Sequence, residues 1–129
     1  MQRALKTGIC GERRFGPAPR LEWHEKLAAA ALAHSRDMAT HNYFSHYAKD
    51  GSTVGDRAAR AGYTWSRIGE NIATGQGSPE QVVAGWLNSP HHCANIMEPD
   101  FRQMGAAYFV NPVSDTVIYW TQVFGTPTG

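Results

Sequence analysis

Apolar residues recur at helical spacing over residues 21–41, the first regular pattern along the chain. Leu27, Ala31 and Met38 share one face of a helix with 3.6 residues per turn, which predicts one long amphipathic helix. His34 lies on the same face. A histidine on an apolar helix face is more often a hydrogen-bonded core residue than a ligand, so we interpret His34 as part of the core.

Residues that start and stop helices predict three shorter helices. The second helix begins after Ser52 or Thr53, either of which can cap it, and stops at Gly62. The third begins at Ser78 and the fourth at Ser89, because each serine is followed by a proline, which fits the first turn of a helix. The second and fourth helices are short, and the apolar face of the third must be buried against another layer.

The spacing of apolar residues changes after residue 99. Residues 106–110 and 116–124 are rich in aromatic and β-branched side chains and are separated by turn-forming residues, which predicts an antiparallel hairpin. A third strand is expected over residues 68–73, because an isolated hairpin is marginally stable in water. The predicted fold class is therefore α+β, with a small antiparallel sheet covered by helices.

Length and composition predict one globular domain. The chain has 129 residues, of which 42% are hydrophobic and 18% charged, and no apolar run reaches the roughly 18 residues of a membrane-spanning helix. A net charge of +1 argues against nucleic acid as a partner. The first nineteen residues contain no apolar signal core, so we expect that any export signal has been removed.

The predicted domain follows an extended arm. Residues 1–20 are rich in glycine, proline and charged side chains, which predicts an arm without regular structure before a single domain over residues 21–129. Cys10 lies in this arm and Cys93 beside the second Ser-Pro pair. A disulfide between them is our main interpretation. The cysteine count leaves the alternative of two unrelated buried thiols in a cytosolic protein.

No familiar catalytic motif occurs in the chain. Polar residues are instead found in loops and helix starts between apolar elements, where they often line a cleft. Two histidines and a glutamate among them can bind a metal or move protons, although each taken alone can equally be structural. The candidates are Ser45, His46, Glu70, Asn71, Ser89 and His92.

Taken in order, a series of short motifs resembles the CAP superfamily of cysteine-rich secretory, antigen 5 and pathogenesis-related proteins, and more specifically its bacterial SCP-like extracellular members. The resemblance covers residues 21–125 and implies secretion and an α-β-α sandwich. The motifs are Leu21-Glu22-Trp23, Asp37-Met38-Ala39, Phe44-Ser45-His46, Asp50-Gly51-Ser52, Arg60-Ala61-Gly62-Tyr63, Gly69-Glu70-Asn71-Ile72-Ala73, Trp86-Leu87-Asn88-Ser89-Pro90-His91-His92-Cys93-Ala94-Asn95-Ile96 and Tyr119-Trp120-Thr121-Gln122-Val123-Phe124-Gly125.

The resemblance also implies a metal-binding cleft and a disulfide. Eukaryotic members line the cleft with two histidines and two glutamates that can hold zinc; His46 and Glu70 match one half of this set, whereas Ser89 and Tyr119 stand at the other two positions. Bacterial relatives bring in a histidine matched here by His92. They also pair an amino-terminal Cys-Gly with the His-Cys of the Ser-Pro segment, which implies a bridge from Cys10 to Cys93.

These residues leave three functions open. We favour a secreted or periplasmic monomer in which His46, Glu70 and His92 bind zinc, another divalent cation or a small ligand without turnover, supported by Ser45, Asn71, Ser89 and Tyr119. The first alternative is a hydrolase with Glu70 as general base, for which no nucleophile is visible. The second is a module that binds lipids, sterols or an extracellular protein, to which no residue can be assigned.

Overall fold

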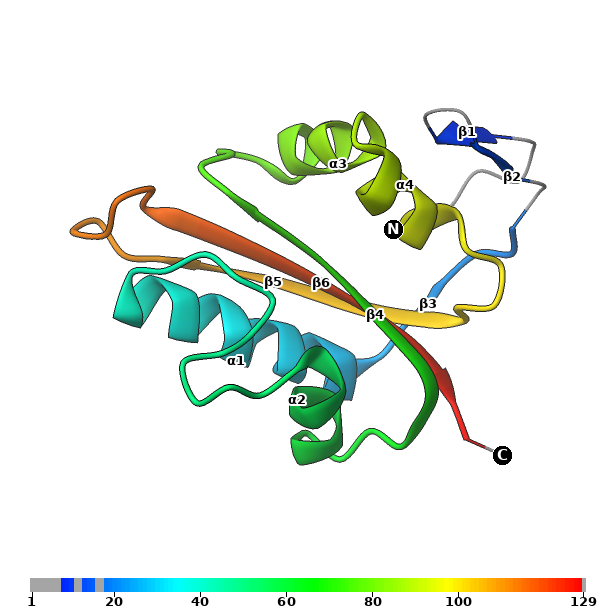
Figure 1. Cartoon of the computed structure of the whole chain (residues 1–129), viewed down its shortest axis with the longest axis horizontal. Coiled ribbons are helices and arrows are strands. Elements are labelled where there is room, and N and C mark those ends of the chain that lie inside the picture. The colour runs from blue at the N-terminus through cyan, green and yellow to red at the C-terminus, as the bar shows by residue number, and fades with distance from the viewer. Residues whose placement is uncertain (1–7, 11–12, 16–17, 129) are drawn as a thin grey trace.

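A four-stranded sheet lies between two layers of helices in the computed structural model, which describes residues 8–10, 13–15 and 18–128 (Figure 1). The order across the sheet is β3 (Glu22–Trp23), β5 (Gln103–Val110), β6 (Ile118–Pro127) and β4 (Trp65–Thr74). β4 and β5 both pair with β6 in antiparallel fashion, as predicted, whereas the short edge strand β3 runs parallel to β5. The sheet is therefore mixed.

Two helices cover each face of the sheet (Figure 1). On one face lie α1 (Glu25–His41) and α2 (Val54–Arg60), and on the other lie α3 (Pro79–Leu87) and α4 (Pro90–Met97). This arrangement is the predicted α-β-α sandwich. Among the described residues, no helix is long and apolar enough to cross a membrane.

The first helix begins four residues later than predicted. Glu22 and Trp23 form β3 by pairing with β5, so the chain is still extended at these positions. His24 then caps α1, because its ring nitrogen accepts a hydrogen bond from the backbone N–H of Lys26 (3.2 Å). The apolar pattern that predicted the helix continues into β3, which is why periodicity alone placed the start too early.

At the other helix starts, some of the predicted serine and threonine caps form the capping hydrogen bond and others have a different role. Of the two predicted caps of α2, Thr53 is used: its hydroxyl accepts from the N–H of Asp56 in a capping box. Ser78 caps α3 in the predicted way. The side chain of Ser89 makes no capping bond to α4 and contacts His92 instead.

Strand β6 contributes alternate side chains to the two faces of the sheet. Trp120 and Phe124 pack in a cluster with Trp86 beneath α3 and α4, while Tyr119 and Val123 belong to clusters beneath α1 and α2. Side chains of successive strand residues point to opposite faces, so this central strand separates two cores.

The amino-terminal arm contains regular structure, contrary to prediction. β1 (Gly8–Cys10) and β2 (Arg13–Phe15) form a two-stranded antiparallel hairpin, while residues 1–7, 11–12 and 16–17 of the arm lie outside the described residues. The disulfide from Cys10 to Cys93 is confirmed, with an S–S distance of 2.01 Å and a Cα–Cα distance of 5.4 Å. It links the hairpin to α4. The boundary between arm and domain stays a prediction.

Candidate functional site

The carboxylate of Glu70 is buried in the strand at the edge of the sheet, and both of its oxygens are hydrogen-bonded. Its side chain is 2% exposed. Oε2 accepts from the guanidinium of Arg57 at 2.6 Å, and Oε1 accepts from Nδ1 of His46 at 2.9 Å. Burial of a carboxylate is costly unless a counter-charge and hydrogen bonds compensate it, and Arg57 and His46 supply both.

Arg57 is the functional residue that sequence analysis missed. It lies on the inward side of α2 with 6% of its side chain exposed, and it also donates to the backbone carbonyl of Ser52 at 3.0 Å. Its neighbours Gly55 and Ala58 are buried too. The sequence signal for a buried cation was therefore an arginine among small residues on one face of a short helix. Its partner Glu70 is thirteen residues away on another element, and only the folded chain brings them together.

His46 lies in the loop between α1 and α2 and is held by Glu70. Because an ionised carboxylate can only accept, Nδ1 of His46 carries the proton of their hydrogen bond. When the ring is neutral, its Nε2 is unprotonated, and this nitrogen has no hydrogen-bond partner among the described residues. With 56% of this side chain exposed, Nε2 is the accessible acceptor of the pair.

His92 lies in the first turn of α4, as predicted, and its ring is also fixed through Nδ1. This nitrogen is 2.8 Å from the hydroxyl of Ser89. Burial lowers the pKa of His92 below its ordinary value, and the charges of His46 and His91 lower it further. His91 itself is exposed.

Asn71 ties α4 to the edge of the sheet. It is fully buried and donates to the backbone carbonyl of His92 at 3.1 Å and to the side chain of Gln122 at 3.3 Å. Asn95 of α4 donates to the Asn71 side chain (3.0 Å) and to the backbone carbonyl of Glu70 (3.2 Å). Glu70 faces α2 and Asn71 faces α4, so the candidate site spans the edge strand β4, with His46 on one side and His92 on the other.

Ser45 and Tyr119, two of the predicted supporting residues, have other partners. The hydroxyl of Ser45 accepts from the N–H of Tyr47 at 3.1 Å. Tyr119 is 2% exposed, packs with Met38 and lies 3.5 Å from the side chain of Asn42 through its hydroxyl. Among the hydrogen bonds of the described residues, neither side chain contacts His46, Glu70 or His92.

His34 is the core histidine that its position on α1 predicted. It is fully buried, and Nε2 donates to the backbone carbonyl of Ser45 at 2.7 Å. Burial lowers the pKa of His34, so the ring is neutral near pH 7. Its bond to Ser45 holds the backbone of the residue next to His46.

Metal binding by the three predicted ligands is not shown in this geometry. No group of three or more His, Cys, Asp or Glu side chains within the described residues is arranged to hold a metal. The carboxylate of Glu70 is, moreover, bonded to Arg57 and His46 through both oxygens. Binding of a metal by His46, Glu70 and His92 stays a prediction.

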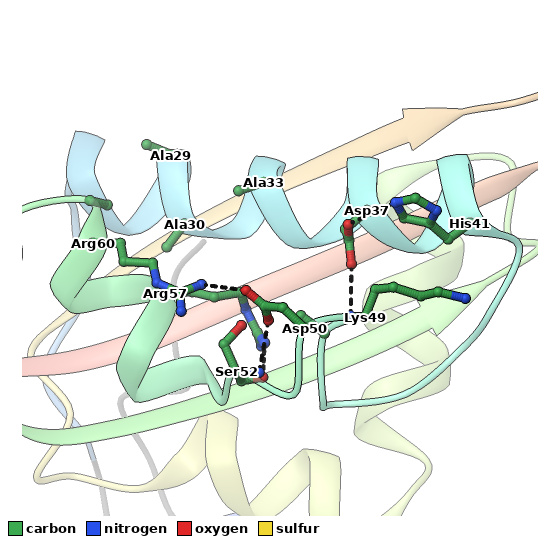
Figure 2. Close-up of a pocket in the computed structure, with 12 residues that line it drawn as sticks. Ala29, Ala30, Ala33, Asp37, His41, Lys49, Asp50, Ser52, Arg57 and Arg60 are labelled. Carbon is green, nitrogen blue, oxygen red and sulfur yellow. Dashed lines mark hydrogen bonds and ion pairs between the residues drawn. The ribbon is translucent and has the colours of Figure 1, made fainter.

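A cavity of about 620 Å³ lies beside the site, between α1 and α2 (Figure 2). Ala29, Ala30 and Ala33 of α1 form one wall. Charged side chains of α2 and the preceding loop lie opposite. Among them Arg60 pairs with Asp50 at 3.0 Å, and both side chains are drawn in Figure 2. Among the lining residues Arg57 alone belongs to the site, so the predicted residues lie outside this cavity.

The amino-acid sequence between residues 11 and 124 matches the family model of the cysteine-rich secretory protein family, CAP. The chain belongs to this family. Over 104 residues the CAP domain is 38% identical to the uncharacterized protein YkwD of Bacillus subtilis, a match that covers 81% of this chain and 38% of YkwD. The chain thus spans well under half the length of that relative.

Solved structures share the fold of this CAP domain. An extracellular protein containing an SCP domain from Bacillus anthracis is 35% identical, with a TM-score of 0.74 over 84% of this chain and 34% of that one. An outer surface protein of Borrelia burgdorferi is 22% identical, with a TM-score of 0.77 over 86% of this chain and 80% of that one. The latter likeness concerns the fold alone.

Proposed function

We propose that this CAP domain acts outside the cytoplasm as a binding module without turnover, and that His46 and His92 form its recognition site. The disulfide from Cys10 to Cys93 supports an oxidising compartment, because such bonds persist mainly in exported proteins. The Bacillus anthracis relative is described as extracellular, which supports the same location.

The observation that carries the proposal is the hydrogen bonding of Glu70 through both carboxylate oxygens. Arg57 balances the charge of Glu70 and holds it in place, and Glu70 in turn fixes the ring of His46. His46 thus presents an oriented acceptor, Nε2, without the cost of ordering its ring when a ligand arrives. The arrangement favours a small polar ligand whose hydroxyl, amide or ammonium group donates to His46.

His92 supplies the second contact of the proposed site. Its lowered pKa keeps the ring neutral at pH 7, so it offers a hydrogen bond rather than a fixed positive charge. Which nitrogen carries the proton depends on the hydrogen bond with Ser89, whose hydroxyl can either donate or accept. A ligand with both a donor and an acceptor group matches this pair of imidazoles.

The test is an NMR titration with polar probes of known chemistry: N-acetylglucosamine, glycylglycine and acetamide. We expect shifts of the side-chain signals of His46 and His92 that saturate with at least one probe and disappear in His46→Ala. The matched control is His41→Ala, which removes an exposed histidine at the end of α1 and is expected to leave the shifts unchanged.

A parallel titration of metal-free protein with zinc chloride separates the two kinds of ligand. One-to-one zinc binding at pH 7 that is lost in both His46→Ala and His92→Ala would overturn the polar-ligand proposal in favour of a metal site. Absence of probe-induced shifts at either histidine would overturn it as well.

A further inference from the structure

The second helical layer leaves part of the sheet uncovered. α3 is nine residues long; its Val82 packs in the same cluster as Met104 of β5, whereas Trp23 of β3 and Tyr108 of β5 stay exposed. A cavity of about 440 Å³ opens there, between Val82 and Val83 of α3 and Met104 and Ala106 of β5. Its volume lies within the range of roughly 300 to 1,000 Å³ of small-molecule sites in proteins.

Three tryptophans line this cavity, and the N–H of each indole is already bonded within the protein. These bonds fix the rings and leave their apolar surfaces for a ligand. The N–H groups donate from Trp23 to Glu25 (3.0 Å), from Trp86 to the carbonyl of Ile72 (3.0 Å) and from Trp120 to the carbonyl of Gln76 (2.8 Å). Trp23 is 52% exposed, whereas Trp86 and Trp120 are buried.

Glu80 gives the cavity its charge. It is exposed in the first turn of α3, and it is the one charged side chain among the described residues that line the cavity. The hydroxyl of Thr121 is engaged by Ser35 at 2.7 Å. The lining thus combines a carboxylate with the electron-rich faces of indoles, and both attract cations.

We propose that this cavity binds an organic cation, namely an ammonium group attached to an apolar or aromatic body. The body would occupy the space between α3 and β5, and the ammonium group would lie near the indoles and Glu80. His46, Glu70 and His92 are not among the lining residues, so this proposal does not depend on the one above.

Three probes that share a phenyl ring and differ in charge test this proposal: benzyltrimethylammonium, 3-phenyl-1-propanol and 3-phenylpropionate. The readout is the shift of the indole N–H signals in NMR spectra. Trp65 is an internal control, because it lies outside the cavity and its N–H donates to the carbonyl of Gly55 at 3.1 Å. We expect saturating shifts of Trp23, Trp86 and Trp120 with the cation, at an affinity about fivefold or more above that of the other probes.

Glu80→Gln is expected to weaken binding of the cation by about threefold or more, since it removes the carboxylate and keeps the shape of the side chain. Asp115→Asn, which removes an exposed carboxylate in the β5–β6 loop, is the matched control and leaves the affinity unchanged. Equal affinity for the neutral or anionic probe, unchanged binding by Glu80→Gln, or shifts dominated by Trp65 would each overturn the proposal.

Discussion

The two faces of the sheet differ in how their interiors are stabilised. Beneath α1 and α2, buried polar groups are hydrogen-bonded to one another, as in Arg57 with Glu70 and Ser35 with Thr121. Beneath α3 and α4 the largest cluster is aromatic and aliphatic, and Phe101 stacks on Phe124 with ring centroids 5.5 Å apart. A polar pair stabilises only while both partners are present, whereas an apolar cluster contributes roughly in proportion to its buried area.

The faces also differ in covalent support. The disulfide joins the amino-terminal hairpin to α4, and so reinforces the layer whose apolar side is incompletely covered. Among the described residues, no disulfide joins α1 or α2 to the rest of the chain. We therefore expect the layer of α3 and α4 to be sensitive to loss of the disulfide, and the layer of α1 and α2 to loss of one partner of a buried polar pair.

Removal of the disulfide is expected to have the largest effect. In Cys10→Ser/Cys93→Ser the free energy of unfolding should fall by about 4 to 5 kcal/mol, because a crosslink over 83 residues no longer restricts the unfolded chain. Urea unfolding with and without a thiol reductant measures the loss. The reductant should destabilise the natural chain and leave the variant unchanged; a loss below about 1 kcal/mol would contradict the reinforcing role of the bridge.

Loss of the buried cation is the next largest effect. Arg57→Leu leaves Glu70 buried without its counter-charge and should lower the free energy of unfolding by about 3 to 5 kcal/mol. Arg60→Leu on the same helix is the control: its ion pair with Asp50 is exposed, and its loss should cost less than about 1 kcal/mol. Urea unfolding measures both losses. Equal losses in the two variants would show that the buried pair contributes no more to the free energy of unfolding than the exposed pair.

Acid should destabilise the α1 and α2 face through His34. Burial lowers its pKa below the ordinary value of 6.5, so as the pH falls the unfolded chain takes up this proton before the folded chain does. The unfolded state then binds more protons, and the free energy of unfolding decreases as the pH falls below about 6.5. His92, whose pKa is lowered mainly by burial, acts in the same direction.

His34→Gln, which keeps a donor for the carbonyl of Ser45, should reduce this pH dependence, measured by urea unfolding between about pH 7.5 and 5. His41→Gln at the exposed end of α1 serves as the control and should retain the full slope. A slope that is the same in all three proteins would exclude His34 as its source.

Local signals predicted most of the fold. Thr53, Ser78 and the aromatic hairpin lie where capping chemistry and strand periodicity placed them, because these preferences act between residues close in sequence. The predicted start of α1 and the prediction of an arm without regular structure were wrong. β3 forms by pairing with a strand about eighty residues away, and such pairing overrides a local apolar pattern.

The candidate site was predictable only in part. His46 and Glu70 were proposed together and are hydrogen-bonded. Arg57 was missed, and Ser89 was expected to cap α4 but contacts His92. The contacts of Arg57 and Ser89 depend on which side chains meet after folding. Each side chain can choose among several hydrogen-bond partners, and the spacing of residues along the sequence does not determine which one it bonds.

The edge strand that carries Glu70 has a further consequence for how this molecule meets its copies. The backbone carbonyls of Glu70 and Ile72 accept from the side chains of Asn95 and Trp86, so a strand from another molecule would have to displace these donors to extend the sheet. At the opposite edge, β3 offers only two residues for pairing. Side chains of α3 and α4 thus protect this edge of the sheet against strand-by-strand aggregation.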